Sequence, residues 1–171
     1  MMTSARIAVV VVVALVGAVV SSGGTVRADD TIKTPGDHPP YVVEIEPHAL
    51  AGFGRFGGNA GVGLGARFSI PIVENGFVRS INNSVAIGFG ADLFFVDHDT
   101  LVFPVVMQWN FFVHRQWSVF GEPGVAVSHS FAPETELRPV LYAGARYHFS
   151  EHAALTMRVG YPSLSVGLSF W

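Results

Sequence analysis

The chain has 171 residues, enough for one domain, and its composition is unusual for a protein that is surrounded by water. Half of the residues are hydrophobic and only 13% are charged, whereas ordinary soluble domains carry about a quarter charged residues. Without cysteine there is no disulfide scaffold, thiolate metal site, cysteine nucleophile or lipid-modified N-terminal cysteine. The net charge of −3 provides no basic surface, which argues against nucleic acid as a partner.

The first 28 residues have the order of a secretory signal peptide. Residues 1–6 carry one positive charge, residues 7–20 form an unbroken apolar run, and the chain is then small and polar up to Ala28. The apolar run is shorter than the roughly 20 residues that a spanning helix needs, which favours cleavage after Ala28 over a retained membrane anchor. No later stretch is long and apolar enough for such a helix, so the rest of the chain is either soluble or crosses a membrane as strands.

The next segment, residues 29–40, is polar and rich in residues that interrupt regular structure. It contains Pro35, Gly36, Pro39 and Pro40, which favour turns over helices and strands. We expect a flexible periplasmic leader here, followed by one folded domain over residues 41–171.

From Tyr41 onward the chain alternates with a period of two. The clearest case is residues 60–70, in which even positions are apolar and odd positions are small or charged. Successive side chains of a strand point to opposite faces, whereas a helix would scatter the glycines of this segment around its circumference. Seven more segments have the same pattern: residues 41–45, 85–95, 101–111, 117–127, 141–149, 155–161 and 164–170. The predicted fold class is all-β, an eight-stranded antiparallel up-and-down transmembrane barrel.

The two faces of these strands differ in charge. The apolar face has no charged member, and the opposite face carries many glycines. Because a lysine or arginine on a lipid-facing surface costs roughly 2–4 kcal/mol at mid-depth, this division favours apolar side chains outside and charges enclosed. A soluble secreted carrier of the lipocalin kind, with the apolar face around a ligand, is the alternative. The charged positions are Glu44, Glu46, Arg67, Asp92, Glu122, Arg146 and Arg158.

An eight-strand barrel leaves an interior just wide enough for side chains to fill, so enclosed charges have to pair. We therefore expect a lumen plugged by ion pairs and hydrogen bonds, with Gln108, Asn110, Tyr142 and His148 attached. A narrow ion path is the alternative, and it would need continuous water.

The last strand, residues 164–171, has no tail after it and places Leu168 and Phe170 on the apolar face. With the alternation from Tyr41 onward, this ending resembles small bacterial outer-membrane β-barrels of the OmpA transmembrane-domain and OmpX type. The resemblance implies insertion into outer-membrane lipid by the barrel-assembly machinery, with Leu168, Phe170 and Trp171 as the assembly signal. Family members usually end on the in-phase aromatic, whereas Trp171 adds one residue here. We expect a monomer.

An even number of strands places both chain ends on one side, which we expect to be the periplasm. Asn75-Gly76 is a hairpin signal at which the second and third strands can extend and meet. Pro104 and Pro123 fall inside strands and each removes a ladder donor, so we expect bulges or displaced strand ends there. The predicted outer loops are residues 49–59, 96–100, 128–139 and 162–163, and the predicted inner turns are residues 71–83, 113–116 and 150–152.

A lipid-modifying enzyme is the second hypothesis, since some eight-strand outer-membrane barrels acylate or deacylate lipid A. The residue types of a serine hydrolase occur in Ser128-His129-Ser130 with Glu134 or Glu136, and in His148-Phe149-Ser150 with Glu151. Asp97-His98-Asp99 has metal-ligand residue types, but an exposed turn is the interpretation that we favour strongly for this segment. Seven histidines and many serines make such neighbours common by chance. We therefore expect no catalytic, cofactor or metal site, and a structural or interactive role at the cell surface.

Overall fold

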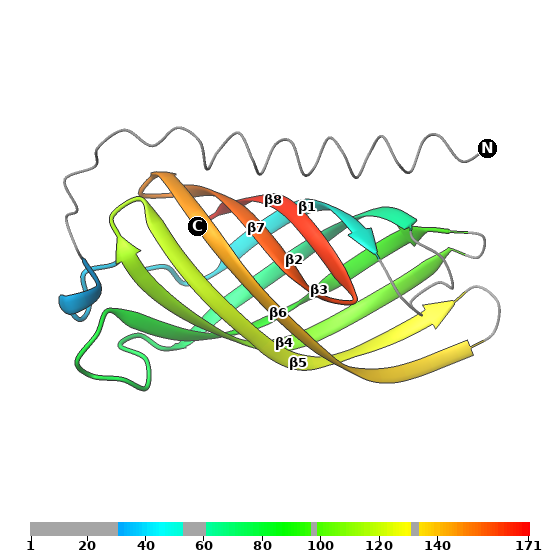
Figure 1. Cartoon of the computed structure of the whole chain (residues 1–171), viewed down its shortest axis with the longest axis horizontal. Coiled ribbons are helices and arrows are strands. Elements are labelled where there is room, and N and C mark those ends of the chain that lie inside the picture. The colour runs from blue at the N-terminus through cyan, green and yellow to red at the C-terminus, as the bar shows by residue number, and fades with distance from the viewer. Residues whose placement is uncertain (1–30, 53–60, 97–98, 131–133) are drawn as a thin grey trace.

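The computed structural model is a closed barrel of eight antiparallel strands (Figure 1). It describes residues 31–52, 61–96, 99–130 and 134–171, so the predicted signal peptide, residues 1–28, lies outside the described residues. In the part of the chain that is described, no helix is long and apolar enough to cross a membrane. The strands are β1 (Glu44–Gly52), β2 (Gly61–Val73), β3 (Asn83–Phe95), β4 (Thr100–His114), β5 (Trp117–Ser130), β6 (Glu134–Ser150), β7 (Ala153–Tyr161) and β8 (Ser163–Phe170).

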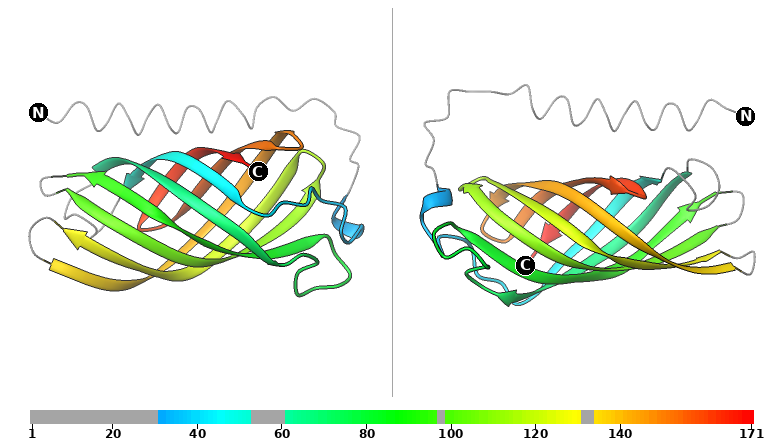
Figure 2. Two further views of the ribbon diagram at one scale, coloured as in Figure 1. Left: turned by 180° about the vertical axis from the view of Figure 1, so that it is seen from behind. Right: turned by 60° about the horizontal axis from the view of Figure 1, so that its bottom comes forward.

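Each strand pairs with its neighbour in the sequence, and β1 pairs with β8 to close the ring. The closing register runs from Ile45 opposite Phe170 to Gly52 opposite Ser163, so β1 begins at the end of the barrel where β8 finishes. Figure 2 shows the strands tilted around the barrel from two further sides. The predicted fold class and strand order are confirmed.

The period-two pattern of the sequence becomes an inside and an outside. Along β1 the side chains alternate between buried and exposed almost without exception, and along β4 buried side chains alternate with half-buried or exposed ones as far as Val113. The exposed set is apolar, as in Leu64, Phe89 and Val105. The geometry of a strand thus converts a simple parity in the sequence into two chemically different surfaces.

Two of the predicted outer loops contain several residues of strand. Residues 49–52 belong to β1, and β5 and β6 stay paired as far as Ser130 opposite Glu134, so most of the segment 128–139 is a hairpin. The alternation pattern did not predict this hairpin, because β6 is polar near its start and carries Glu136 and Arg138 there. Conversely, β1 begins at Glu44, three residues after Tyr41.

The predictions for proline and for the Asn75-Gly76 turn need correction. Pro104 and Pro123 lie within β4 and β5, where they pair in register with Ala126 and Leu141. The register shifts occur instead between Pro71 and Val73, Phe112 and His114, and His148 and Ser150. All three lie beside turns at the end of the barrel that holds its termini, and bulges are common at barrel rims. β2 and β3 do not extend to meet at Asn75-Gly76, since they end and begin at Val73 and Asn83.

The described part of the leader lies against this same end of the barrel. A short 3-10 helix, η1 (Thr31–Lys33), contacts β4, and Thr31 Oγ1 donates to the carbonyl of Phe112 at 3.2 Å. Asn82 fastens the segment further, because its backbone N–H donates to Ile32 and its side-chain amide donates to Asp37, both at 2.7 Å. The composition of the leader does not predict these contacts.

Candidate functional site: the barrel lumen

All seven charged residues of the predicted network lie inside the barrel, and each is at most 3% exposed. They come from β1, β2, β3, β5, β6 and β7, so closure of the ring is what brings them together. The parity of each strand places them inward, and the register of the strands decides which of them meet.

Arg158 is the centre of the network. Its Nη1 and Nη2 donate to the two carboxylate oxygens of Glu46 at 2.7 and 3.0 Å, which is a two-pronged ion pair. Its Nε and Nη2 donate to Glu122 at 2.8 and 3.2 Å. One guanidinium therefore binds two buried carboxylates on strands far apart in the sequence, and this planar fork suits arginine better than lysine.

A second group of charges surrounds Asp92. Arg67 bridges Asp92 and Glu122 at 3.3 and 3.4 Å, and His48 Nε2 donates to the other oxygen of Asp92 at 2.9 Å. The Nδ1 atom of His48 lies 3.2 Å from the carbonyl oxygen of Glu46. Sequence reasoning missed His48, although its even position in β1 matches Glu44 and Glu46 and would have identified it.

Arg146 forms the part of the network closest to the barrel's termini. It donates to Glu44 at 2.8 Å and to the side-chain oxygen of Asn110 at 2.7 Å. Asn110 in turn contacts Gln108 at 3.4 Å, and Gln108 donates to Glu122 at 2.7 Å. Polar side chains thus connect the Arg146 pair to the Arg158 cluster, and two of the predicted attachments, Gln108 and Asn110, are the connectors.

Aromatic rings fill the space between the cations. The Phe120 ring has the guanidinium of Arg146 4.6 Å and that of Arg158 5.2 Å from its centre, and Arg67 lies 5.6 Å from the Tyr142 ring. Cations within about 6 Å of a ring face are attracted by its quadrupole. Phe120 was not predicted as a lumen residue.

Glycines on the inner face leave room for these groups. A Cβ on Gly144 would lie 2.2 Å from the Phe120 ring, and a Cβ on Gly65 would lie 2.4 Å from Asp92 Oδ1. Both distances are far below van der Waals contact, so a side chain at either position would displace part of the network.

The lumen is not polar throughout, which corrects the expectation of a polar interior. Near the β1–β2, β3–β4 and β5–β6 loops, inward positions carry apolar side chains that pack into one buried cluster. The charged part and this apolar part follow each other along the barrel axis. The cluster consists of Leu50, Phe94, Val102, Val106, Ala126, Val140 and Tyr142.

The candidate hydrolase sets are arranged differently from the sequence prediction. His148 Nε2 pairs with Ser118 Oγ at 2.9 Å, while Ser150 Oγ accepts from the backbone N–H of His152. His148 Nδ1 has no partner among the described residues, so no carboxylate orients this pair.

At the opposite end, the predicted serine–histidine set is also engaged elsewhere. His129 Nδ1 pairs with Thr135 Oγ1 at 2.9 Å, and Ser128 Oγ donates to the carbonyl of Glu136. Within the described residues no group of three or more metal-ligand side chains is placed to hold a metal ion. Asp97 and His98 of the candidate metal turn lie outside the described residues.

A ring of eight antiparallel strands in sequence order, apolar outside and charged within, defines the class of small up-and-down β-barrels found in outer membranes. No protein-family model and no curated protein sequence matches the chain. Among solved structures, it is similar to the N-terminal β-barrel domain of Pseudomonas aeruginosa OprF, with a TM-score of 0.51 and 14% identity over 75% of this chain and 95% of that one.

A de novo designed transmembrane β-barrel has a TM-score of 0.50 and 14% identity, over 81% of this chain and 98% of that one. Ail of Yersinia pestis has a TM-score of 0.49 and 15% identity, over 75% of this chain and 96% of that one. At 14% identity, the similarities to the OprF domain and to the designed barrel establish a shared fold.

Proposed function

We propose that the protein is an integral outer-membrane β-barrel with a closed lumen, and that its role is structural or interactive at the cell surface. The observation that carries the proposal is the separation of charge: an ion-pair network is enclosed by the barrel, while the outer wall is apolar. Lipid favours this arrangement because a charge on the outer wall would be desolvated without a partner.

The alternative of a soluble carrier requires the reverse arrangement. A carrier of the lipocalin kind encloses an apolar cavity for its ligand and exposes polar side chains to water. Here the enclosed side chains include paired arginines and carboxylates, and large apolar residues such as Leu64, Val105 and Leu141 are among the most exposed. Such an outer wall in water would be a large apolar patch of the kind that causes association.

Aromatic side chains near the chain termini support a membrane boundary at that end. Trp109 and Phe111 on β4 have ring centres 4.9 Å apart, and Trp117 and Tyr147 on β5 and β6 have ring centres 5.1 Å apart. Tryptophan and tyrosine gather at membrane–water interfaces, where one end of the ring stays hydrated.

Membrane fractionation tests this proposal directly. The protein should stay with isolated outer membranes after washing with salt and should require detergent for release. Its mobility on a gel should change when the sample is heated, as the barrel unfolds. Recovery from the aqueous periplasm or the medium without detergent would overturn the proposal and favour the soluble carrier.

The closed lumen is proposed from the packing inside the barrel. The arginines of the charged part are paired with carboxylates, and the apolar cluster around Phe94 and Val102 lies between them and the β3–β4 loop. Ions would have to leave their hydration shells to pass an apolar constriction. In planar bilayers the purified protein should give no stepwise conductance, and steady channel events would support the narrow ion path instead.

The terminal strand supports a proposal for assembly. Leu168 and Phe170 are exposed on the outer wall, while Trp171 turns towards the barrel mouth, where its ring lies 5.5 Å from that of His148. We propose that Leu168, Phe170 and Trp171 form the assembly signal. Within it, we assign recognition by the barrel-assembly machinery to the two outward residues, Leu168 and Phe170.

A further inference from the structure

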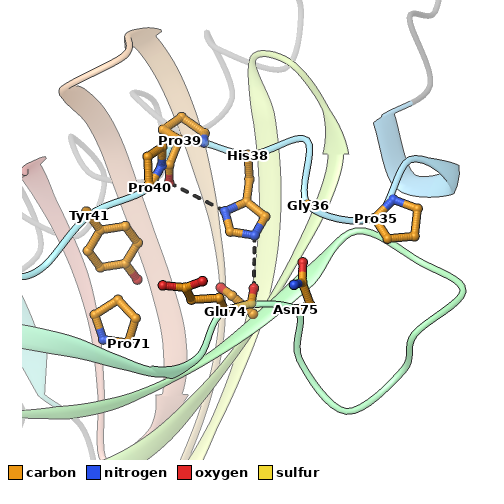
Figure 3. Close-up of a pocket in the computed structure, with 10 residues that line it drawn as sticks. Pro35, Gly36, His38, Pro39, Pro40, Tyr41, Pro71, Glu74 and Asn75 are labelled. Carbon is orange, nitrogen blue, oxygen red and sulfur yellow. Dashed lines mark hydrogen bonds between the residues drawn. The ribbon is translucent and has the colours of Figure 1, made fainter.

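The leader lies against the mouth of the barrel at the end where β1 begins and β8 finishes. The His38 ring stacks on Phe112 with a centroid distance of 4.5 Å, and its Nε2 donates to the carbonyl of Glu74 at 3.0 Å. Figure 3 shows the His38 side chain pointing from the leader towards Glu74, with Tyr41 further along the chain. An open pocket of about 440 Å³ is lined by this segment on one side and by the end of β2, the β2–β3 turn and Ser84 of β3 on the other.

A much smaller chamber lies where the leader enters β1. Its volume is about 10 Å³, which is the size at which a cavity begins to accommodate one water molecule. Pro39 and Tyr41 contribute one side, and the barrel contributes Glu44, Arg146 and His148, with Trp171 of the C-terminus.

Four of the residues that line this chamber each carry a buried polar atom with no hydrogen-bond partner in the described part of the chain. Arg146 is 3% exposed and its two terminal nitrogens bind Asn110 and Glu44, so Nε is the one guanidinium nitrogen without a hydrogen-bond partner in the described part of the chain. Buried polar groups in native proteins almost always have a partner. The four atoms are Tyr41 Oη, Arg146 Nε, His148 Nδ1 and Trp171 Nε1.

The hydrogen-bonding capacities of these atoms fit one particular ligand. Arg146 Nε–H and Trp171 Nε1–H can only donate, whereas Tyr41 Oη and His148 Nδ1 can accept. The Tyr41 hydroxyl is protonated at neutral pH, and burial raises the pKa of this phenol further above its ordinary value. A water molecule accepts two hydrogen bonds and donates two, which matches this set.

We propose that the chamber binds one structural water molecule, which joins the leader to the barrel wall and to the C-terminus. A small anion fits less well, because Arg146 is already neutralised by Glu44 at 2.8 Å and Glu44 lines the same chamber. The proposed bonding also sets the tautomer of His148, whose Nε2–H then donates to Ser118 Oγ.

The test uses the full mature protein in detergent micelles with ¹⁵N-labelled tryptophan. The chain has three tryptophans, and the variants Trp109→Phe and Trp117→Phe assign the remaining indole signal to Trp171. We expect a cross-peak between the Trp171 indole proton and a long-lived water molecule. Trp109 is the matched control because its indole N–H donates to Asn83 at 2.9 Å, and it should show no such cross-peak.

Two further measurements distinguish the ligands. Titration with sodium bromide should leave the Trp171 indole resonance unchanged, whereas a saturable shift would identify an anion site and overturn the proposal. The variant Tyr41→Phe removes one acceptor and should weaken the Trp171 water cross-peak while Trp109 stays unchanged. Absence of the cross-peak in the unmodified protein, or no effect of Tyr41→Phe, would also overturn it.

Discussion

Arg158 illustrates how single residues hold the lumen together. Its guanidinium contacts Glu46 and Glu122, and all three side chains are almost fully enclosed. A buried ion pair does not guarantee a net gain in stability, because removing each ion from water is costly. Loss of one partner is different, because it leaves an uncompensated charge in the interior.

We therefore expect Arg158→Met to destabilise the barrel by about 3–5 kcal/mol, since two carboxylates lose their shared cation. Urea unfolding in lipid vesicles, followed by gel mobility, measures this change. Arg138→Met is the matched control, because Arg138 pairs with Glu136 at a more exposed position and should change stability far less. Equal stability of the two variants would contradict the role given to the lumen network.

At the scale of a single strand, the position of a residue decides whether its side chain faces the lumen or the outer wall. The parity of β4 places Val105 outward, where its side chain is 51% exposed, and places Val106 inward in the apolar cluster. Neighbouring valines of one strand thus face different environments. Only the outward one should be sensitive to the cost of placing a charge in lipid.

Val105→Arg should reduce the free energy of unfolding in lipid vesicles by about 2–4 kcal/mol, because arginine on the lipid face near mid-depth is desolvated. Val42→Arg is the control, since Val42 is 85% exposed and precedes β1. If both substitutions were tolerated equally, the outer wall would not be in contact with lipid.

The terminal strand is a second element with a testable role. Phe170→Ala should lower the amount of heat-modifiable protein in the outer membrane, because the proposed signal loses its aromatic ring. Phe149→Ala provides the comparison, as Phe149 is another exposed aromatic residue at the same end, on β6. A similar loss in both variants would indicate a general requirement for aromatic residues instead of recognition of β8.

At the scale of the whole molecule, the two ends of the barrel differ. One end carries the leader, the C-terminus and the β2–β3 turn, and the other carries the β5–β6 hairpin. β6 is the longest of the described strands. It begins at Glu134, whereas its pairing with β7 begins only at Leu141, opposite Tyr161, so its first residues extend beyond β7 at this end. We propose that this hairpin faces the outside of the cell and that the leader faces the periplasm.

Because the chain has no cysteine, single cysteines can report this orientation. Leu137→Cys, on β6 at a position that is 69% exposed, should react with a membrane-impermeant maleimide in intact cells. Phe77→Cys, in the β2–β3 turn, should react only after the outer membrane is permeabilised. The opposite labelling pattern would reverse the proposed orientation.

Alternation along the chain was sufficient to predict eight strands, the all-β barrel and the inward position of seven charged residues. Side-chain direction in a strand is a local property with a period of two, so it can be read from neighbours in the sequence. Which charges meet depends on register and closure, as with Arg158 and Glu46, which are 112 residues apart. The polar hairpin of β5 and β6 lacks an apolar face, so the tertiary structure alone identified its paired strands. The position of the leader over the barrel mouth likewise depends on contacts with distant residues such as Asn82 and Phe112, because packing against a surface exists only after that surface has formed.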